Sequence, residues 1–138
     1  MITTLQEFKK LNERSHYMSE VEDYGSYEGI IHSDINSIKN WFSKRNMDYD
    51  KYLNLLELPV AFLNNINIEE EHRGQGYGNI LFSKFENECY ENDAKCILLE
   101  SDRDEHQSNG FNLDNWYISL GFEIIGNEGG NSIMLNIL

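Results

Sequence analysis

The sequence predicts an α/β protein with a mixed β-sheet whose central strands run parallel. Two apolar strand-like runs, residues 60–68 and 95–100, flank an amphipathic helical pattern over residues 78–91. A strand, a helix and a second strand in this order form a parallel pair joined by a crossover helix. A helical turn and two more strand patterns follow, so the order β-α-β-α-β-β predicts a mixed sheet.

The first 59 residues give the weaker signals. Residues 3–12 have the spacing of a short helix, and residues 27–32 have the composition of a strand. Asp34 is a candidate N-cap for a second helix. The side chains expected to face inward from that helix are Ile35, Ile38, Trp41 and Phe42. Residues 49–58 are compatible with either a strand or a helix.

Residues 60–68 predict a strand with a polar far end, because several asparagines follow its apolar start. The helix over 78–91 repeats apolar residues at the spacing of one buried face. Its inward side chains are Leu81, Phe82, Phe85 and Cys89. Residues 95–100 form a nearly continuous apolar run, which is typical of a strand covered on both faces of a sheet.

The last part of the chain predicts a short helix and a hairpin. A polar loop over 101–110 precedes a helical turn around Leu113, Trp116, Tyr117 and Leu120. Gly121 then stands where a glycine commonly ends a helix. Strand patterns over 122–125 and 132–138 surround a glycine-containing turn, as in a hairpin.

Composition and charge narrow the function. The 138 residues, 40% of them hydrophobic, fit one folded domain over 1–138. Eleven basic against 24 acidic residues give a net charge of −13, which disfavours nucleic acid and anionic membranes as partners. Such a surface attracts polyamines, aminoglycoside-like amines or basic protein segments. Taken alone, however, the charge is explained more simply by solubility.

Cys89 and Cys96 are the two cysteines, and they do not form a CxxC motif. We expect two reduced, buried thiols. The N-terminus lacks the apolar core of a signal peptide, and no apolar run approaches the ~20 residues of a transmembrane helix. These features favour a cytoplasmic protein.

Residues 66–78 carry the strongest functional signal. The end of a strand runs through a charged turn into Arg73-Gly74-Gln75-Gly76-Tyr77-Gly78, and a helix follows at once. Glycines let the backbone adopt unusual dihedrals and approach a ligand closely. Several N–H groups and a helix N-terminus would then face one anion, which predicts a site for a cofactor diphosphate. A tight turn that caps the helix without a ligand is the simpler alternative.

Two other glycine-rich motifs do not fit this loop. A P-loop needs Lys and then Ser or Thr after its last glycine, whereas Asn79 and Ile80 follow Gly78. A dinucleotide-binding fingerprint needs G-x-G-x-x-G directly after a strand, and here Asn79 occupies the position of the third glycine.

A third motif fits. Residues 73–78 resemble the Arg/Gln-x-x-Gly-x-Gly/Ala element of the Gcn5-related N-acetyltransferase (GNAT) superfamily, and Trp116-Tyr117-Ile118-Ser119-Leu120-Gly121-Phe122 resembles its aromatic-Tyr-x-x-Leu-Gly-Phe segment. The resemblance covers residues 60–138 and implies an acyl-CoA N-acyltransferase fold. Residues 1–59 do not show the strand and helix pair with which such proteins usually open.

The resemblance implies that acetyl-CoA binds between two parallel strands, 60–68 and 95–100, that splay apart. Backbone groups of one strand would pair with the pantetheine arm, and the glycine loop would hold the pyrophosphate. Arg73 would order that loop. An asparagine of the superfamily that often contacts the cofactor falls at Gly110, next to Asn109. The cofactor-binding residues so implied are Asn67, Ile68, Arg73, Gly74, Gln75, Gly76, Tyr77, Gly78, Asn79 and Asn109.

The resemblance places Tyr117 where a general acid protonates the departing thiolate, a task that suits a phenol. A packed aromatic whose hydroxyl finds a partner is an equally good explanation of Tyr117. Glu100 is the best placed candidate for the general base. Nearby residues that compete for this role are Asp102, Asp104, Glu105 and His106. The glutamates at 69–71 are expected to point outward. No His or Cys set has ligand spacing, so we expect no metal.

Together these features predict an N-acetyltransferase that moves acetyl from acetyl-CoA to a primary amine, either a cationic small molecule or a basic peptide. The alternative is a protein that keeps the fold, has lost catalysis, and uses its acidic surface to bind or inhibit a basic partner protein. Proteins of this kind often pair through edge strands, so a homodimer is compatible with either function. Neither function involves nucleic acid or membrane.

Overall fold

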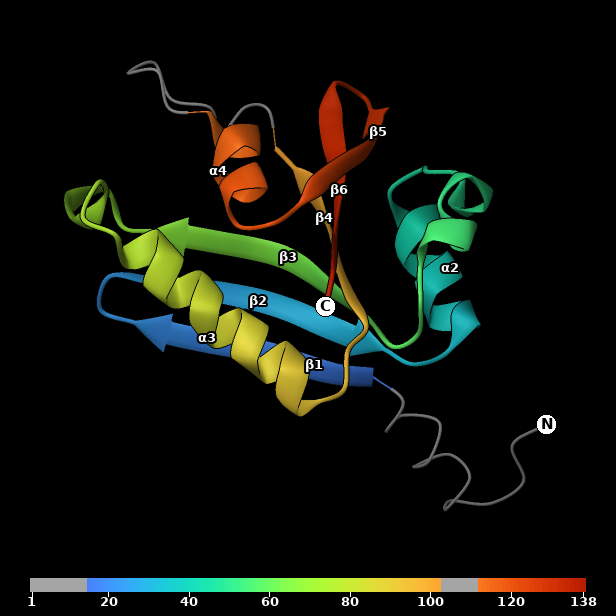
Figure 1. Ribbon diagram of the computed structural model, residues 1–138, viewed down its shortest axis with the longest axis horizontal. Helices are drawn as coiled ribbons and strands as arrows, with labels where there is room; N and C mark the ends of the chain where they lie inside the picture. The colour runs from blue at the N-terminus through green and yellow to red at the C-terminus, as the bar shows by residue number, and fades with distance from the viewer. Residues whose placement is uncertain (1–14, 103–111) are drawn as a thin grey trace.

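The computed structural model describes residues 15–102 and 112–138 of the chain. In these ranges the strands form one mixed sheet in the order β1-β2-β3-β4-β6-β5 (Figure 1). The strands are β1 (Ser15–Glu22), β2 (Gly25–His32), β3 (Val60–Ile68), β4 (Cys96–Ser101), β5 (Glu123–Glu128) and β6 (Asn131–Ile137). The α-helices are α2 (Ile35–Lys44), α3 (Tyr77–Glu91) and α4 (Leu113–Ser119). The predicted α/β class with a mixed sheet is confirmed.

The sheet begins with a strand that the sequence did not predict. β1 forms an antiparallel hairpin with β2 at the edge of the sheet. The apolar residues of β1 do not all lie on one face: Met18 is buried, whereas Tyr17 and Val21 are each 79% exposed. An edge strand with apolar residues on its open face and polar residues between them lacks the regular pattern of a half-buried strand.

The helix α2 starts as predicted, with the Asp34 side chain accepting a hydrogen bond of 2.9 Å from the Ser37 backbone N–H. Its buried residues are Ile38, Trp41 and Phe42. The expectation for Ile35 was wrong: it is 36% exposed, so the buried face begins one turn later. The ambiguous stretch that follows forms two short 3₁₀ helices, η1 (Tyr49–Lys51) and η2 (Leu53–Leu55).

The central strands β3 and β4 are parallel, but they pair only from Val60↔Cys96 to Phe62↔Leu98. Asn64 is an extra residue in β3, because Leu63 and Asn65 oppose consecutive residues of β2. Such a bulge bends its strand and interrupts pairing. Beyond the bulge, β3 stays paired with β2 and β4 stays paired with β6, so the two central strands diverge.

Each face of the sheet has its own hydrophobic core. Side chains from α3 and α4 pack on one face, and Figure 1 shows α3 lying across β1 to β3. The α2 segment packs on the other face. β4 contributes to both, with Ile97 and Leu99 on the α3 side and Cys96 and Leu98 on the α2 side. This confirms the expectation that the apolar run of β4 is covered on both faces.

After α4, Gly121 takes a φ of +107°, and the predicted C-terminal hairpin of β5 and β6 follows. The hairpin is attached to the first half of the chain through η1 and η2: the Tyr52 hydroxyl donates a hydrogen bond of 2.7 Å to Glu128. Within the described ranges, no helix combines the length and apolar character needed to cross a membrane.

Candidate functional site

The predicted anion loop lies between β3 and α3. After the short helix η3 (Glu70–His72), Gly74 and Gly76 adopt φ values of +78° and +86°. A side chain at either position would be strained, and an added Cβ would meet no heavy atom within 4 Å. The backbone here therefore borders open space, next to the positive end of the 15-residue helix α3. A helix N-terminus with an open backbone beside it is the kind of local structure that binds anions in proteins.

The loop is held by its own side chains. The Arg73 Nε donates a hydrogen bond of 2.8 Å to the Ile68 carbonyl, and its Nη2 lies 3.5 Å from the Asn67 Oδ1. The Gln75 amide donates a bond of 3.3 Å to the Glu71 carbonyl. Arg73 thus links the loop back to the end of β3. Glu69, Glu70 and Glu71 are exposed, as expected.

Aromatic rings support the loop from the first half of the chain. Tyr24, in the turn between β1 and β2, stacks on Tyr77 with ring centroids 4.4 Å apart. The His72 ring also contacts the Tyr77 ring edge-on, with ring centroids 5.6 Å apart. The backbone N–H of Glu69 also donates to the Tyr24 carbonyl over 2.8 Å. The turn that follows the unpredicted strand β1 is therefore part of the support for the glycine loop.

The two sequence motifs meet at the first turn of α3. A Cβ on Gly78 would lie 3.1 Å from the Trp116 ring, so α4 packs directly against that glycine. The Trp116 indole N–H donates a hydrogen bond of 2.9 Å to the Asn79 side chain. These residues are 37 positions apart, and their contact joins the loop motif to the motif around Tyr117.

Tyr117 lies beneath this contact and is 6% exposed. Its ring lies 5.0 Å from that of Trp116 and 5.7 Å from that of Phe122. The helix that carries it is fixed by Asp114, which accepts hydrogen bonds of 2.5 Å from Ser101 and 2.6 Å from Ser132. Asp114 therefore ties α4 to the end of β4 and the start of β6.

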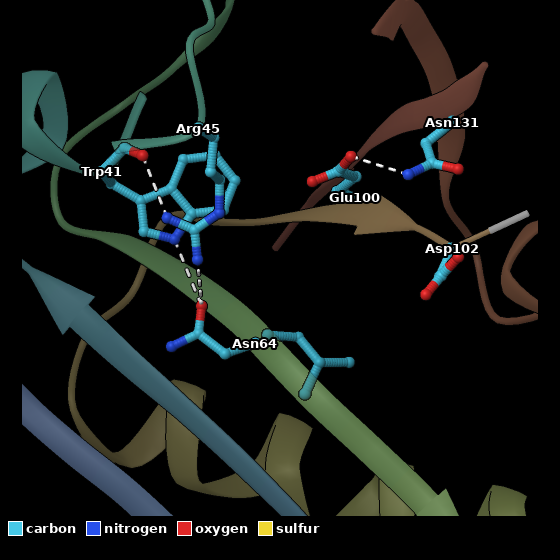
Figure 2. Close-up of a pocket in the computed structure, with 7 residues that line it drawn as sticks. Trp41, Arg45, Asn64, Glu100, Asp102 and Asn131 are labelled. Carbon is cyan, nitrogen blue, oxygen red and sulfur yellow. Dashed lines mark hydrogen bonds between the residues drawn. The ribbon is translucent and has the colours of Figure 1, made fainter. Parts of the chain in front are cut away.

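A cavity of about 180 Å³ opens where β3 and β4 diverge, on the α2 side of the sheet (Figure 2). Its lining comes from α2 and its C-cap, from β3, from β4 and the residue after it, and from β6. It includes two carboxylates and one guanidinium. The lining residues are Trp41, Arg45, Leu63, Asn64, Glu100, Asp102 and Asn131. The predicted base candidates Glu100 and Asp102 thus lie in one cavity.

Hydrogen bonds fix the polar side chains of this cavity. Glu100 accepts a bond of 2.8 Å from the Asn131 amide. Arg45 lies over the Trp41 ring at 3.8 Å from its centroid and donates a bond of 2.9 Å to the Trp41 carbonyl. The Asn64 Oδ1 accepts from the Trp41 indole over 3.2 Å and from Arg45 over 3.4 Å. Burial lowers the pKa of the Arg45 guanidinium, and the negative charge of Glu100 opposes that shift.

The sequence reasoning missed part of this site. Trp41 was expected in the core, and nothing marked Arg45, Asn64 or Asn131 as site residues. They meet only because α2 and the β5–β6 hairpin fold over the same end of the central strands. The remaining predicted residues lie outside the described ranges; they are Asp104, Glu105, His106 and Asn109.

Several solved structures share the fold. An acetyltransferase from Bacillus cereus matches with a TM-score of 0.59 at 14% identity, over 100% of this chain and 96% of that one. The PaiA N-acetyltransferase of Thermoplasma acidophilum, in complex with coenzyme A, has a TM-score of 0.56 at 16% identity, over 97% and 69%. A GNAT family acetyltransferase of Elizabethkingia anophelis with acetyl-CoA bound has a TM-score of 0.55 at 12% identity, over 98% and 84%.

No family model matches the sequence, and no curated protein matches it. At such low identities the structural likeness shows the fold alone. That fold is the GNAT fold, and it extends through the first half of the chain, where the sequence showed no resemblance. The resemblance drawn from the two motifs is therefore confirmed at the level of fold.

Proposed function

We propose that this chain is an N-acetyltransferase that moves the acetyl group of acetyl-CoA to a primary amine. The observation that carries the proposal is the glycine loop, where the backbone of Gly74 and Gly76 borders open space at the start of α3. The likeness to the coenzyme A complex of the T. acidophilum protein and the acetyl-CoA complex of the E. anophelis protein supports it.

The loop and the end of β3 would bind the cofactor. Backbone N–H groups of residues 74–79 would hold the diphosphate, since N–H groups at a helix N-terminus favour anions. Beyond the last parallel pair, no strand of the described ranges pairs with the edge of β3 that faces β4. The backbone of Asn67 and Ile68 lies on that part of β3 and would hydrogen-bond the pantetheine arm, as in the addition of a strand to a sheet edge.

Acetyl-CoA would supply an acetyl thioester, whose C–S bond breaks as the new C–N bond forms to the amine. Glu100 would accept the proton that the attacking amine loses, directly or through water. Tyr117 would donate a proton to the departing sulfur and recover it from solvent afterwards. Both residues are held in place, Glu100 by Asn131 and Tyr117 by its neighbouring rings.

Calorimetric titration with acetyl-CoA tests the proposal directly. We expect micromolar binding and a matching rise in melting temperature, because a ligand of the native state stabilises it. Gly76→Asp should abolish binding, since the new carboxylate would occupy the space left for the diphosphate and repel it.

The matched control for that variant is Gly129→Asp. Gly129 also has a positive φ, +60°, and open space around its Cβ position, but it lies in the β5–β6 turn. Both variants should lose similar stability, on the order of 1–2 kcal/mol from the left-handed backbone. Only Gly76→Asp should lose binding. A folded wild-type protein that does not bind acetyl-CoA would refute the enzyme and favour the non-catalytic acidic binding protein.

A further inference from the structure

Opposite charges face each other across the cavity without neutralising one another. Figure 2 shows the Arg45 guanidinium on one side and the Glu100 carboxylate on the other, with Asp102 near Glu100. Arg45 and Glu100 influence each other electrostatically, yet within the described ranges no ion pair joins Arg45 to a carboxylate. The cavity therefore has a positive end and a negative end.

The positive end of the cavity is the guanidinium of Arg45, which neighbouring groups hold in place. Arg45 lines the cavity, is stacked on Trp41 and donates to the Trp41 carbonyl and to Asn64. Within the described part of the chain, its other guanidinium N–H groups have no hydrogen-bond acceptor. A partly buried charge is costly when it lacks a counter-charge. Arginine binds carboxylates with particular strength, because its planar fork can donate parallel hydrogen bonds. Arg45 is thus prepared for an anionic group of a ligand.

The negative end suits an ammonium. Glu100 Oε2 accepts from Asn131, whereas Oε1 has no hydrogen-bond partner in the described part of the chain. Asp102 adds a second carboxylate to the lining at the end of β4. Because Glu100 is also the proposed base, an amine bound here would lie next to the group that takes its proton.

A polycationic acceptor fits this arrangement poorly. Its second ammonium would approach the Arg45 guanidinium, and like charges repel strongly in a cavity partly shielded from water. The volume of about 180 Å³ is sufficient for a small acceptor.

On the basis of the proposed function, we propose that the acetyl acceptor is a small zwitterion, a free amino acid whose ammonium binds at Glu100 and whose carboxylate binds at Arg45. This narrows the range expected from net charge alone, which included polyamines, aminoglycosides and basic peptides. The net charge of −13 is a property of the whole chain, whereas Arg45 places a positive charge in the cavity itself.

The test compares acceptors that differ in a single group. Free thiol release from acetyl-CoA is measured with each of the common amino acids, with the corresponding amino acid amides, and with spermidine. At least one amino acid should exceed its amide in kcat/KM by about tenfold or more, the value of a hydrogen-bonded charge pair. The same amino acid should bind the coenzyme A-saturated protein in calorimetry, and its amide should bind more weakly.

Arg45→Gln should raise KM for the amino acid about 10- to 100-fold and leave KM for the amide nearly unchanged. Arg45→Lys keeps the charge without the planar fork, so its discrimination should fall between that of the wild type and that of Arg45→Gln. The control is Lys44→Gln, which removes the same charge from the exposed neighbouring residue and should not alter discrimination. Unchanged acetyl-CoA affinity and melting temperature would show that Arg45→Gln is folded.

The two proposals fail separately. If acetyl-CoA binds but no amino acid exceeds its amide or spermidine, the zwitterion is refuted and the acetyltransferase stands. If Arg45→Gln and the wild type prefer the amino acid over its amide equally, the proposal is also refuted, because another group would then bind the carboxylate. If acetyl-CoA does not bind, the proposed function itself has failed.

Discussion

Tyr117 combines an observed packing role with the proton-donor role that we propose for it. Its ring is enclosed by Trp116 and Phe122, and only 6% of its surface is exposed. A phenol held in this way keeps a fixed direction for its hydroxyl, which a proton donor requires. The same enclosure would exist if the residue only filled the core. Removing the hydroxyl alone therefore distinguishes a proton donor from a packed ring.

We therefore expect Tyr117→Phe to lower kcat about 100-fold, the lower range for loss of a general acid, while the Kd of acetyl-CoA stays unchanged. The ring contacts survive this substitution, so the protein should still fold. Steady-state kinetics and calorimetry measure the two quantities. Tyr90→Phe, at a 54% exposed position of α3, is the control. If turnover is unchanged in Tyr117→Phe, the residue belongs to the core alone.

At the scale of elements, one carboxylate ties α4 to the sheet. Asp114 accepts from two serine hydroxyls, Ser101 and Ser132, which are 1% and 9% exposed. These bonds link the helix that carries Tyr117 to β4 and β6. Because these bonds fix the helix rather than a reacting group, we regard Asp114 as a positioning residue.

Asp114→Ala should destabilise the fold by about 1–3 kcal/mol, because two buried hydroxyls lose their acceptor. It should also lower kcat more than it weakens acetyl-CoA binding, since Tyr117 moves while the glycine loop remains. Chemical denaturation and steady-state kinetics measure these effects. The exposed Asn115 lies on the same helix, and Asn115→Ala should leave both unchanged. A loss of stability with normal kcat would show that the tie does not position Tyr117.

The elements that the sequence predicted well are those with local signals. The loop over 73–78 and the helix after it follow from glycines and from a regular apolar spacing, and both lie where expected. β1 was missed because an edge strand buries little. The acceptor cavity was missed for another reason: the bulge at Asn64 and the position of Arg45 result from pairing between distant segments. No local pattern in the sequence reports on such pairing.

At the scale of the whole molecule, one sheet separates two tasks. Its α3 side supports the glycine loop and Tyr117, and its α2 side carries the cavity that we propose for the acceptor. The cavity begins beyond the last parallel pair, where Asn64 of β3 and Glu100 of β4 both line it. An acetyl donor bound along the diverging strands could therefore be reached from the α2 side. This geometry requires both cores to be intact, because each fixes one wall of the site.

The two cysteines report on these cores separately. Cys89 belongs to the core on the α3 side and Cys96 to the core on the α2 side, and both are 0% exposed. Burial raises the pKa of the Cys89 thiol to about 12 and also raises the pKa of Cys96. Because the thiolate is the reactive form, a raised pKa and burial both suppress reaction in the native state.

Since β4 contributes side chains to both cores, we expect the molecule to unfold as one cooperative unit. Both thiols should then react with iodoacetamide at the same slow rate, and the dependence of that rate on denaturant should follow global unfolding. Peptide mapping by mass spectrometry resolves the two sites. Faster labelling of Cys96 would show that the α2 side opens on its own, and that the acceptor cavity is less stable than the cofactor loop. Bound coenzyme A should slow both reactions equally if unfolding is cooperative, because it stabilises the native state as a whole.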